Sequence, residues 1–225
     1  MKKVIIFGTT AFEERLKHLI ENHIGDSVVA FCVDSEYAKT NEFCGVPLVE
    51  SNKLLESFSP QEHTVLVGIG YKNMNELRME KFKFIKELGF EGYNLIHPKA
   101  FIDSNVDLGQ GNIILGDSFI DYGTKIGDCN IFEIGVHVSH ECVIGNYNYI
   151  SPGVTIGGSV NVHDRCFLGL GSILRSAINV DDKCLIGAGA YVDGDVIESS
   201  VVVPSRSKTL NHLSTDMNIL YKRKQ

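Results

Sequence analysis

The fold is decided by a segment that reads Val138-Ser139-His140-Glu141-Cys142-Val143-Ile144-Gly145-Asn146-Tyr147-Asn148-Tyr149-Ile150-Ser151-Pro152-Gly153-Val154-Thr155-Ile156. Every sixth residue of this segment is large and apolar, and the same spacing continues in both directions. The complete series has sixteen members: Ile102, Leu108, Ile114, Ile120, Ile126, Phe132, Val138, Ile144, Ile150, Ile156, Val162, Leu168, Leu174, Val180, Ile186 and Val192. A fixed period of this kind indicates a repeat architecture.

A six-residue repeat predicts a short flat strand followed by a tight turn. The large residue points inward, and the glycine that often follows it permits the turn. Three repeats close a triangular coil of about 18 residues. We therefore predict a left-handed parallel β-helix over residues 98–200, although this hand departs from the usual right-handed crossover rule. The pattern stops at Glu198, and residues 201–225 are expected to form a tail that caps the open end.

Residues 1–97 follow a different pattern, in which strand and helix signals alternate. The expected strands are Val4–Phe7, Val28–Val33, Val65–Gly70 and Tyr93–Ile96. The expected helices cover residues 11–24 and 73–88, where apolar residues recur at helical spacing. This alternation predicts βαβ units with a parallel sheet, which is a Rossmann-like α/β domain.

The composition is that of an ordinary folded protein, since 44% of the 225 residues are hydrophobic and 22% are charged. The net charge of −7 disfavours a nucleic acid or an anionic membrane as partner. No apolar run reaches the length of about 18 residues that a spanning helix needs. The apolar run after Lys3 is too short for a signal peptide. We therefore expect a cytoplasmic protein.

The six cysteines form no CxxC pair, which argues against a metal cage and against a disulfide framework. No metal is expected. Cys142, Cys166 and Cys184 occupy equivalent positions in the repeat and are interpreted as small core residues. A nucleophilic Cys142 beside His140 is the alternative.

Several motifs connect both parts of the chain to one family. A Leu95-Ile96-His97-Pro98 junction follows the α/β region, and the sharpest motif is Ser139–Gly145 followed by Ile150–Gly153. Two further matches are Phe167–Ser172 and Leu185–Ala190. With these motifs the chain resembles, over essentially its whole length, the sugar O-acyltransferase NeuD family. That family includes bacterial nucleotide-sugar N-acetyltransferases of the bacillosamine and perosamine type, which are hexapeptide-repeat acyltransferases.

The resemblance implies a catalytic pair and a set of contacts for acetyl-CoA. It assigns the general base to His140, with Glu141 as its polar partner. Tyr149 stands where the family often has a second histidine near the thioester carbonyl, and its phenol could donate a hydrogen bond there. The other cofactor-binding residues that it implies are Gly158, Leu170, Ala188 and, by pairing with a CoA phosphate, Arg206.

The resemblance is looser for the nucleotide-sugar site. It implies contacts from Gly8, Thr9 and Thr10 after the first strand, from Asp34 after the second and from Gly70 after the third. The loop at Gly8 lacks the GxGxxG pattern, so NAD is not expected. A strand–turn–helix start still offers backbone amides that suit a phosphate. The segment from Gly70 to Arg78 resembles a longer variant of the family's Gly-Asn-Asn loop.

The length of one coil gives an independent argument about assembly. Gly158 lies 18 residues after His140, so the two stack on one edge of the prism, where a glycine leaves room for a substrate. Ala188 lies 18 residues after Leu170, on a different edge. Two neighbouring subunits can bring these edges together around one acyl donor. We therefore expect a homotrimer with active sites between subunits.

The combined interpretation is an acetyl-CoA-dependent N-acetyltransferase that acts on a UDP- or dTDP-linked amino sugar. Three alternatives stay open. One is an O-acetyltransferase that acts on a sugar hydroxyl, of the sialic-acid type. Another is a γ-type carbonic anhydrase, which would need three zinc-binding histidines, and the repeat contains only His137, His140 and His163. The last is a non-catalytic trimeric binding protein.

Overall fold

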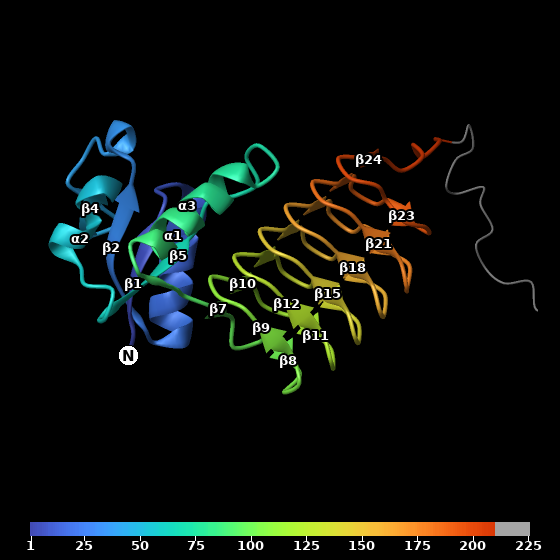
Figure 1. The fold of residues 1–225 in the computed structure, drawn as a ribbon, viewed down its shortest axis with the longest axis horizontal. Coiled ribbons are helices and arrows are strands. Elements are labelled where there is room, and N and C mark those ends of the chain that lie inside the picture. Colours follow the sequence, from blue (N-terminus) through green and yellow to red (C-terminus); the bar gives the residue numbers. More distant parts are fainter. Residues whose placement is uncertain (210–225) are drawn as a thin grey trace, which may run out of the picture.

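The structure is a computed structural model that describes residues 1–209. Figure 1 shows an α/β domain beside a β-helix, which extends away from it as a stack of coils. The predicted fold, a Rossmann-like α/β domain followed by a left-handed parallel β-helix, is confirmed. Of the tail expected at 201–225, residues 210–225 lie outside the described residues.

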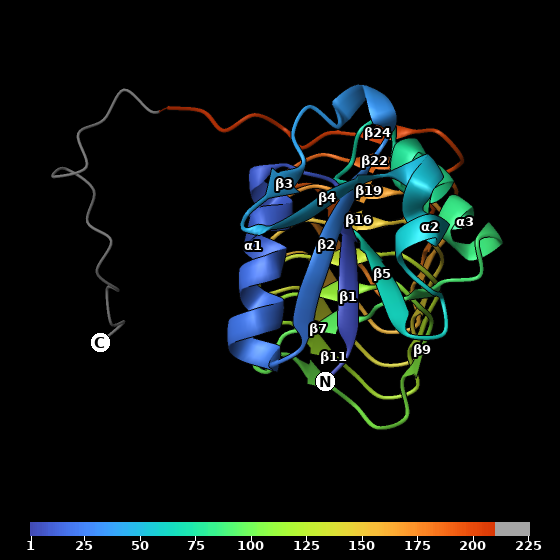
Figure 2. The same ribbon diagram turned by 90° about the vertical axis from the view of Figure 1, so that its left-hand side faces the viewer.

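The α/β domain is built on one sheet with the strand order β3-β4-β2-β1-β5-β6. Its strands are β1 (Lys3–Phe7), β2 (Ser27–Val33), β3 (Glu42–Phe43), β4 (Val46–Glu50), β5 (His63–Val67) and β6 (Glu91–Gly92). Neighbouring strands are parallel, except that β3 and β4 are antiparallel. Figure 2 shows α1 on one side of the sheet and α2 and α3 on the other.

The helices of this domain are α1 (Ala11–Leu19), continued by the π-helical turn η1 (Ile20–Ile24), the 3-10 turns η2 (Ser35–Tyr37) and η3 (Ser51–Lys53), α2 (Leu54–Ser57) and α3 (Glu76–Glu87). The sequence pattern does not predict β3 and β4. Helix α3 begins later than expected, because Asn73, Met74 and Asn75 have positive φ angles that a right-handed helix does not allow.

The β-helix has three faces, each a parallel sheet of two-residue strands. The first face consists of β7 (Leu95–Ile96), β10 (Ile113–Ile114), β13 (Ile131–Phe132), β16 (Tyr149–Ile150), β19 (Phe167–Leu168), β22 (Leu185–Ile186) and β24 (Val201–Val202). The second face consists of β8 (Phe101–Ile102), β11 (Phe119–Ile120), β14 (His137–Val138), β17 (Thr155–Ile156), β20 (Ile173–Leu174) and β23 (Tyr191–Val192). The third face consists of β9 (Asp107–Leu108), β12 (Lys125–Ile126), β15 (Val143–Ile144), β18 (Asn161–Val162) and β21 (Asn179–Val180).

The second residue of each strand from β8 to β23 belongs to the sixfold series and points into the prism. From Ile114 to Val192 every one of these side chains is buried. Cys142, Cys166 and Cys184 are buried in the same core, as the repeat predicts. The interior of the prism is therefore a continuous apolar column that contains no side chain from residues 1–94.

Both expected boundaries of the β-helix need correction. Strand β7, taken above as the last strand of the α/β domain, pairs with β10 and is the first rung of the prism, so the β-helix begins before residue 98. At the other end, β24 pairs with β22 and extends the first face beyond residue 200. Val202 pairs with Ile186, a step of 16 residues (202 − 186), whereas earlier steps are 18. This shorter last coil explains why the sixfold series fails at Glu198.

A ladder of asparagines runs along the corner between the third and first faces. Its members are Asn94, Asn112, Asn130 and Asn148, one per coil. The side-chain oxygen of each accepts a hydrogen bond from the backbone N–H of the residue one coil later, at 2.7–2.9 Å. Three of the four ladder side chains are fully buried. Their hydrogen bonds satisfy backbone polar groups of the turns and hold each coil on the next.

The first face of the prism carries the α/β domain. The outward side chains of Leu95, Ile113 and Ile131 are buried there, in one apolar cluster with residues of β1 and α1 such as Ile6 and Leu16. The second and third faces have no such cover among residues 1–209 and expose large apolar side chains, for example Tyr191.

Candidate active site

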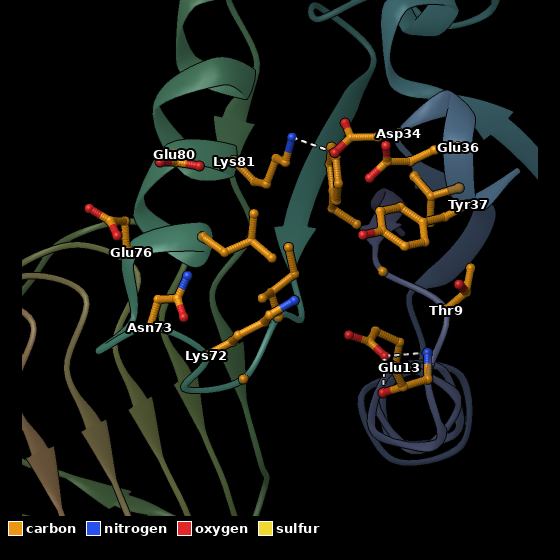
Figure 3. A pocket seen from close by; sticks show the side chains of 17 residues that line it. Thr9, Glu13, Asp34, Glu36, Tyr37, Lys72, Asn73, Glu76, Glu80 and Lys81 are labelled. Atoms are coloured by element: carbon orange, nitrogen blue, oxygen red, sulfur yellow. Dashed lines mark hydrogen bonds and ion pairs between the residues drawn. The ribbon is translucent and has the colours of Figure 1, made fainter.

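A cavity of about 480 Å³ opens where β1, β2 and β5 end in the α/β domain (Figure 3). The carboxyl ends of parallel strands are the usual place for ligands in such sheets. All five residues expected to bind the nucleotide sugar line it: Gly8, Thr9, Thr10, Asp34 and Gly70. Twelve further residues complete the wall: Phe7, Glu13, Val33, Glu36, Tyr37, Ile69, Lys72, Asn73, Glu76, Leu77, Glu80 and Lys81.

Asp34 is already engaged on one side of the cavity. One carboxylate oxygen accepts a hydrogen bond from Ser51 Oγ at 2.8 Å, and the other forms an ion pair with Lys81 Nζ at 2.6 Å (Figure 3). The Lys81 ammonium also lies 5.6 Å from the ring centre of Phe7. Asp34 and Lys81 thus join β2 to α3 and give this wall a fixed, charge-balanced polar group.

At the start of α1, after Gly8, the backbone N–H groups of Thr10 and Phe12 have hydrogen-bond acceptors within the chain. The Glu13 carboxylate accepts the Thr10 backbone N–H at 2.6 Å, and the Thr10 hydroxyl accepts the Phe12 N–H at 3.2 Å, which is a capping box. Glu13 is buried. The Thr10 amide is therefore not free for a phosphate, and the buried carboxylate opposes an anion at this helix end.

His140 lies far from this cavity in the same chain. It occupies the turn between β14 and β15, at the corner between the second and third faces, opposite the face that the α/β domain covers. Its side chain is 57% exposed, and its Nδ1 lies 3.2 Å from the Glu141 carboxylate. When Nδ1–H donates to that carboxylate, the lone pair is on Nε2.

Gly158 lies beside His140 one coil later, as the coil length predicts. A β-carbon built on Gly158 would be only 2.6 Å from Nε2 of His140. The absence of a side chain at Gly158 therefore keeps the space beside Nε2 of His140 open.

The other expected cofactor residues lie elsewhere on the prism. Leu170 and Ala188 lie at the corner between the first and second faces, and Leu170 is 59% exposed. Arg206 is exposed and follows β24. One chain thus presents the cavity, the His140 corner and the Leu170 corner as three separate places.

No protein-family model matches the chain, and no curated protein matches it in sequence. Solved structures match it closely in fold. It is similar to PerB from Caulobacter crescentus, solved in complex with CoA and GDP-perosamine, at 28% sequence identity, with 93% of this chain and 98% of that chain covered and a TM-score of 0.78. The chain is an acyltransferase with the hexapeptide-repeat fold.

Two further likenesses concern the fold alone. The acetyltransferase domain of PglB from Neisseria gonorrhoeae FA1090 is 23% identical, with 89% of this chain and 96% of that chain covered and a TM-score of 0.79. WeeI from Acinetobacter baumannii AYE is 20% identical, with 90% and 97% covered and a TM-score of 0.77. The match extends over both the α/β domain and the β-helix of the acyltransferase.

Tyr149 of the acyltransferase lies on the first face, not beside His140. Its hydroxyl donates a hydrogen bond to Glu133 at 3.0 Å, and Glu133 lies 3.7 Å from the Arg15 guanidinium. Burial, with the charge of Glu133, raises the pKa of Tyr149. The Tyr149 hydroxyl thus donates its hydrogen bond to Glu133. It does not donate to the thioester carbonyl in this arrangement, which is the role that the sequence suggested.

An aromatic cluster next to the cavity was not foreseen from the sequence. The Tyr71 ring lies 5.0 Å from Tyr149 and 4.9 Å from Phe167, centre to centre, and Tyr149 stacks on Phe167 at 5.6 Å. Tyr71 is exposed and lies between two cavity residues, Gly70 and Lys72. The available signal was the spacing of 18 between Tyr149 and Phe167, which puts both rings on one face.

The thiols of the acyltransferase are unsuited to nucleophilic work. Cys142 Sγ lies 3.1 Å from the Gly157 carbonyl, and burial raises the pKa of this thiol. Burial also raises the pKa of Cys166 to about 12. A buried thiol that stays protonated is a weak nucleophile, which disfavours Cys142 as the attacking group.

Within residues 1–209 no group of three or more His, Cys, Asp or Glu side chains could hold a metal ion. His137 lies on the second face, and its ring stacks on Phe119 with centres 5.0 Å apart. His163 lies at the corner between the third and first faces, so His137, His140 and His163 do not converge in one chain. No helix of the described part is long and apolar enough to cross a membrane.

Proposed function

We propose that the protein transfers an acetyl group from acetyl-CoA to the amine of a nucleotide-linked amino sugar. The observation that carries the proposal is the pairing of a cavity at the strand ends with an exposed His140–Glu141 pair, in the fold shared with PerB. The PerB structure contains CoA and GDP-perosamine. Two solved variants of that enzyme, in which a histidine is replaced by alanine or asparagine, contain the same two molecules.

In the proposed reaction the amine nitrogen attacks the thioester carbonyl carbon. A C–N bond forms, the C–S bond breaks, and the sulfur leaves with its electron pair. Nε2 of His140 accepts the proton that the nitrogen loses and passes it to the thiolate of CoA. The contact with Glu141 favours the tautomer with the lone pair on Nε2 and stabilises the protonated ring. Gly158 leaves room for the reacting groups at Nε2.

The α/β domain would hold the nucleotide and the β-helix would carry the chemistry. The cavity would hold the nucleotide. The aromatic cluster of Tyr71, Tyr149 and Phe167 would pack against the apolar side of a hexose ring that extends out of the cavity opening. Leu170 and Ala188 are assigned to acetyl-CoA, with Arg206 as a partner for one of its phosphates.

The proposal requires more than one subunit at each site. His140 lies at the corner opposite the first face, while the cavity and the aromatic cluster lie on the first-face side. A single chain cannot bring its own base to its own cavity without unfolding the prism. We infer a homotrimer, in which the His140 corner of one subunit meets the cavity side of its neighbour.

We further propose that the reaction takes place in the cytoplasm. All six cysteines are free, which fits a reducing compartment. The nucleotide is proposed to be UDP or dTDP, and GDP enters the test because of the ligand in the PerB structure.

A thiol-release assay with acetyl-CoA tests the proposal. The panel contains 4-amino sugars linked to UDP, dTDP and GDP, with sialic acid as the hydroxyl acceptor. We expect release of CoA with at least one nucleotide-linked amino sugar and an acetamide in the product by mass spectrometry. Turnover with sialic acid alone would replace the proposal by O-acetylation, and no turnover with any acceptor would remove it.

A further inference from the structure

Arg78 is a completely buried cation at the junction of the α/β domain and the β-helix. On the α/β side its Nη1 donates to the carbonyl oxygens of Gly70 at 2.8 Å and Ile69 at 3.2 Å. Both of these residues line the cavity. The guanidinium therefore holds the backbone of the cavity wall directly.

On the other side the same guanidinium binds the β-helix at the corner between its third and first faces. Nη2 donates to Tyr147 O at 2.7 Å and to Asn148 O at 3.0 Å, and Nε donates to Cys129 O at 3.1 Å. The segment 147–148 leads directly into Tyr149. One side chain thus ties the cavity wall to two successive coils.

The partners of Arg78 are carbonyl groups and not carboxylates. No ion pair within residues 1–209 includes this guanidinium. Burial lowers its pKa to about 10, so it stays charged at neutral pH. A buried charge without a counter-ion is costly unless its donors are satisfied, and the planar fork of arginine fits several carbonyls at once. Lysine has fewer donors and no such fork.

The segment that Arg78 holds needs support. Asn73, Met74 and Asn75 have φ angles of 51°, 47° and 62°, three consecutive left-handed residues without a glycine. At Met74 this conformation costs roughly 1–2 kcal/mol, whereas the two asparagines tolerate it better. Two more contacts from the β-helix corner fasten the segment: Asn75 Nδ2 donates to Cys166 O at 3.0 Å, and Arg165 Nε donates to Met74 O at 3.3 Å.

This segment carries polar groups into the cavity. Lys72 and Asn73 line it on the side opposite Asp34, whereas the Glu76 carboxylate points away, 3.4 Å from the Arg165 guanidinium (Figure 3). The other cavity lysine, Lys81, is paired with Asp34, whereas Lys72 is in no ion pair of the described part. Lys72 and Asn73 are therefore the donors that a nucleoside diphosphate would meet.

We propose that Arg78 is a positioning residue for the nucleotide: it fixes residues 69–76 against the β-helix and so fixes Lys72 and Asn73 in the cavity. Arg78 touches no ligand itself. The inference rests on the proposed function, because the cavity must bind a nucleoside diphosphate. We call the hydrogen bonds of the Arg78 guanidinium to the cavity wall and the β-helix the clamp. Loosening the clamp should weaken nucleotide binding and leave acetyl-CoA binding unchanged.

The test compares three variants of the full-length protein. Arg78→Lys removes the fork at the clamp. Arg165→Asn removes the hydrogen bond from Arg165 to Met74 O. Asparagine tolerates the φ of 61° at this position, so this variant replaces Arg78→Lys if Arg78→Lys does not fold. The control is Lys86→Ala, which breaks an exposed contact of the same helix α3 with Gln110 (Nζ–Oε1 2.7 Å) outside the cavity wall.

Binding of UDP, dTDP and GDP is measured by calorimetry, KM for the nucleotide sugar and for acetyl-CoA by the thiol assay, and folding by circular dichroism. We expect a rise of about 10- to 100-fold in nucleotide Kd and sugar KM for Arg165→Asn or Arg78→Lys, with acetyl-CoA KM and kcat within twofold. Lys86→Ala is expected to match the wild type.

The outcomes separate the two proposals. Nucleotide binding by the wild type without turnover would remove the proposed reaction but leave the clamp testable by Kd. Folded Arg165→Asn and Arg78→Lys variants with wild-type nucleotide Kd would overturn the clamp. Equal losses for nucleotide and acetyl-CoA would show a merely structural role. A wild type that binds none of the three nucleotides would overturn both proposals.

Discussion

His140 is exposed on the surface of the prism, so its role can be tested without disturbing the core. We expect His140→Ala to lower kcat by roughly 10²–10⁴, the usual contribution of a positioned general base. The melting temperature should hardly change, because no apolar contact of the column is lost. The defect should deepen as the pH falls, since more of the substrate amine then carries a proton that must be removed.

His163→Ala is the matched control for this variant. His163 is also exposed in a turn of the prism, but it lies at another corner. We expect its kcat to stay within about twofold of the wild type. A His140→Ala enzyme with wild-type kcat between about pH 6 and 9 would exclude this histidine from the mechanism.

Gly158 offers a test of the same site by a single methyl group. Its φ is not in the left-handed region, so alanine fits the backbone, but the new β-carbon would lie 2.6 Å from Nε2 of His140. The exposed ring must swing away, and we expect Gly158→Ala to lower kcat by about tenfold or more. Gly194, at the same corner two coils later, has open space around its position. Gly194→Ala should be indistinguishable from the wild type in a parallel kinetic measurement.

At the level of elements, the asparagine ladder should contribute strongly to stability. Asn130 is buried, accepts from the Asn148 N–H at 2.8 Å and donates to Gly145 O at 2.9 Å. Asn130→Ala leaves both backbone groups without a partner. We expect a loss of about 2–4 kcal/mol in the free energy of unfolding, at about 1–3 kcal/mol per buried group.

Urea unfolding followed by circular dichroism measures this loss. The control is Asn105→Ala, whose side chain bonds Asp103 in an exposed turn and should change stability by less than about 0.5 kcal/mol. Equal stability of the two variants would mean that the ladder contributes nothing beyond the apolar column.

The β-helix could be predicted from the sequence because its rule is local and repeats with every coil. Its ends could not, because β7 and β24 join the prism through pairing with distant strands. The ladder was readable as Asn94, Asn112, Asn130 and Asn148, but only once the coil length was known. The loop at 69–76 was not predictable, since its left-handed residues depend on support from the β-helix.

The candidate site also contains residues that could be predicted from the sequence and residues that could not. The five cavity residues were implied by the family resemblance, and the His140–Gly158 neighbourhood follows from the coil length. Arg78 does not, because in the sequence it is one cation on an amphipathic helix. Only the packing of α3 on the prism buries it. Tyr149 was expected at the thioester, but its partner Glu133 becomes visible only in three dimensions.

For the whole molecule, the separation of base and cavity predicts complementation between two nearly inactive variants. Gly70 lines the cavity and has open space at its β-carbon, so Gly70→Trp should fill the cavity while the fold persists. Alone, His140→Ala should keep about 1% of wild-type activity or less, and Gly70→Trp should have little activity because its cavity is filled. Co-expressed in equal amounts, they should recover about one quarter of wild-type activity in a trimer with shared sites, because half of the bases and half of the cavities are intact.

Sedimentation of the same mixture gives the subunit number. Activity that stays at the level of the two separate variants, in a mixed oligomer, would contradict a site shared between subunits. A monomer with full wild-type activity would contradict the assembly itself.

The constant 18-residue step between coils limits how this half of the chain can change over generations. An insertion or deletion inside the prism that is not a whole coil would shift the later residues relative to the coil before them, and would move His140, Leu170 or the ladder away from its partners. Descendants of this sequence should therefore gain or lose whole coils. The last coil, which is two residues shorter, is an exception: the shortening follows Val192, and in the described part only Val196 and β24 come after it, both still paired with the coil before.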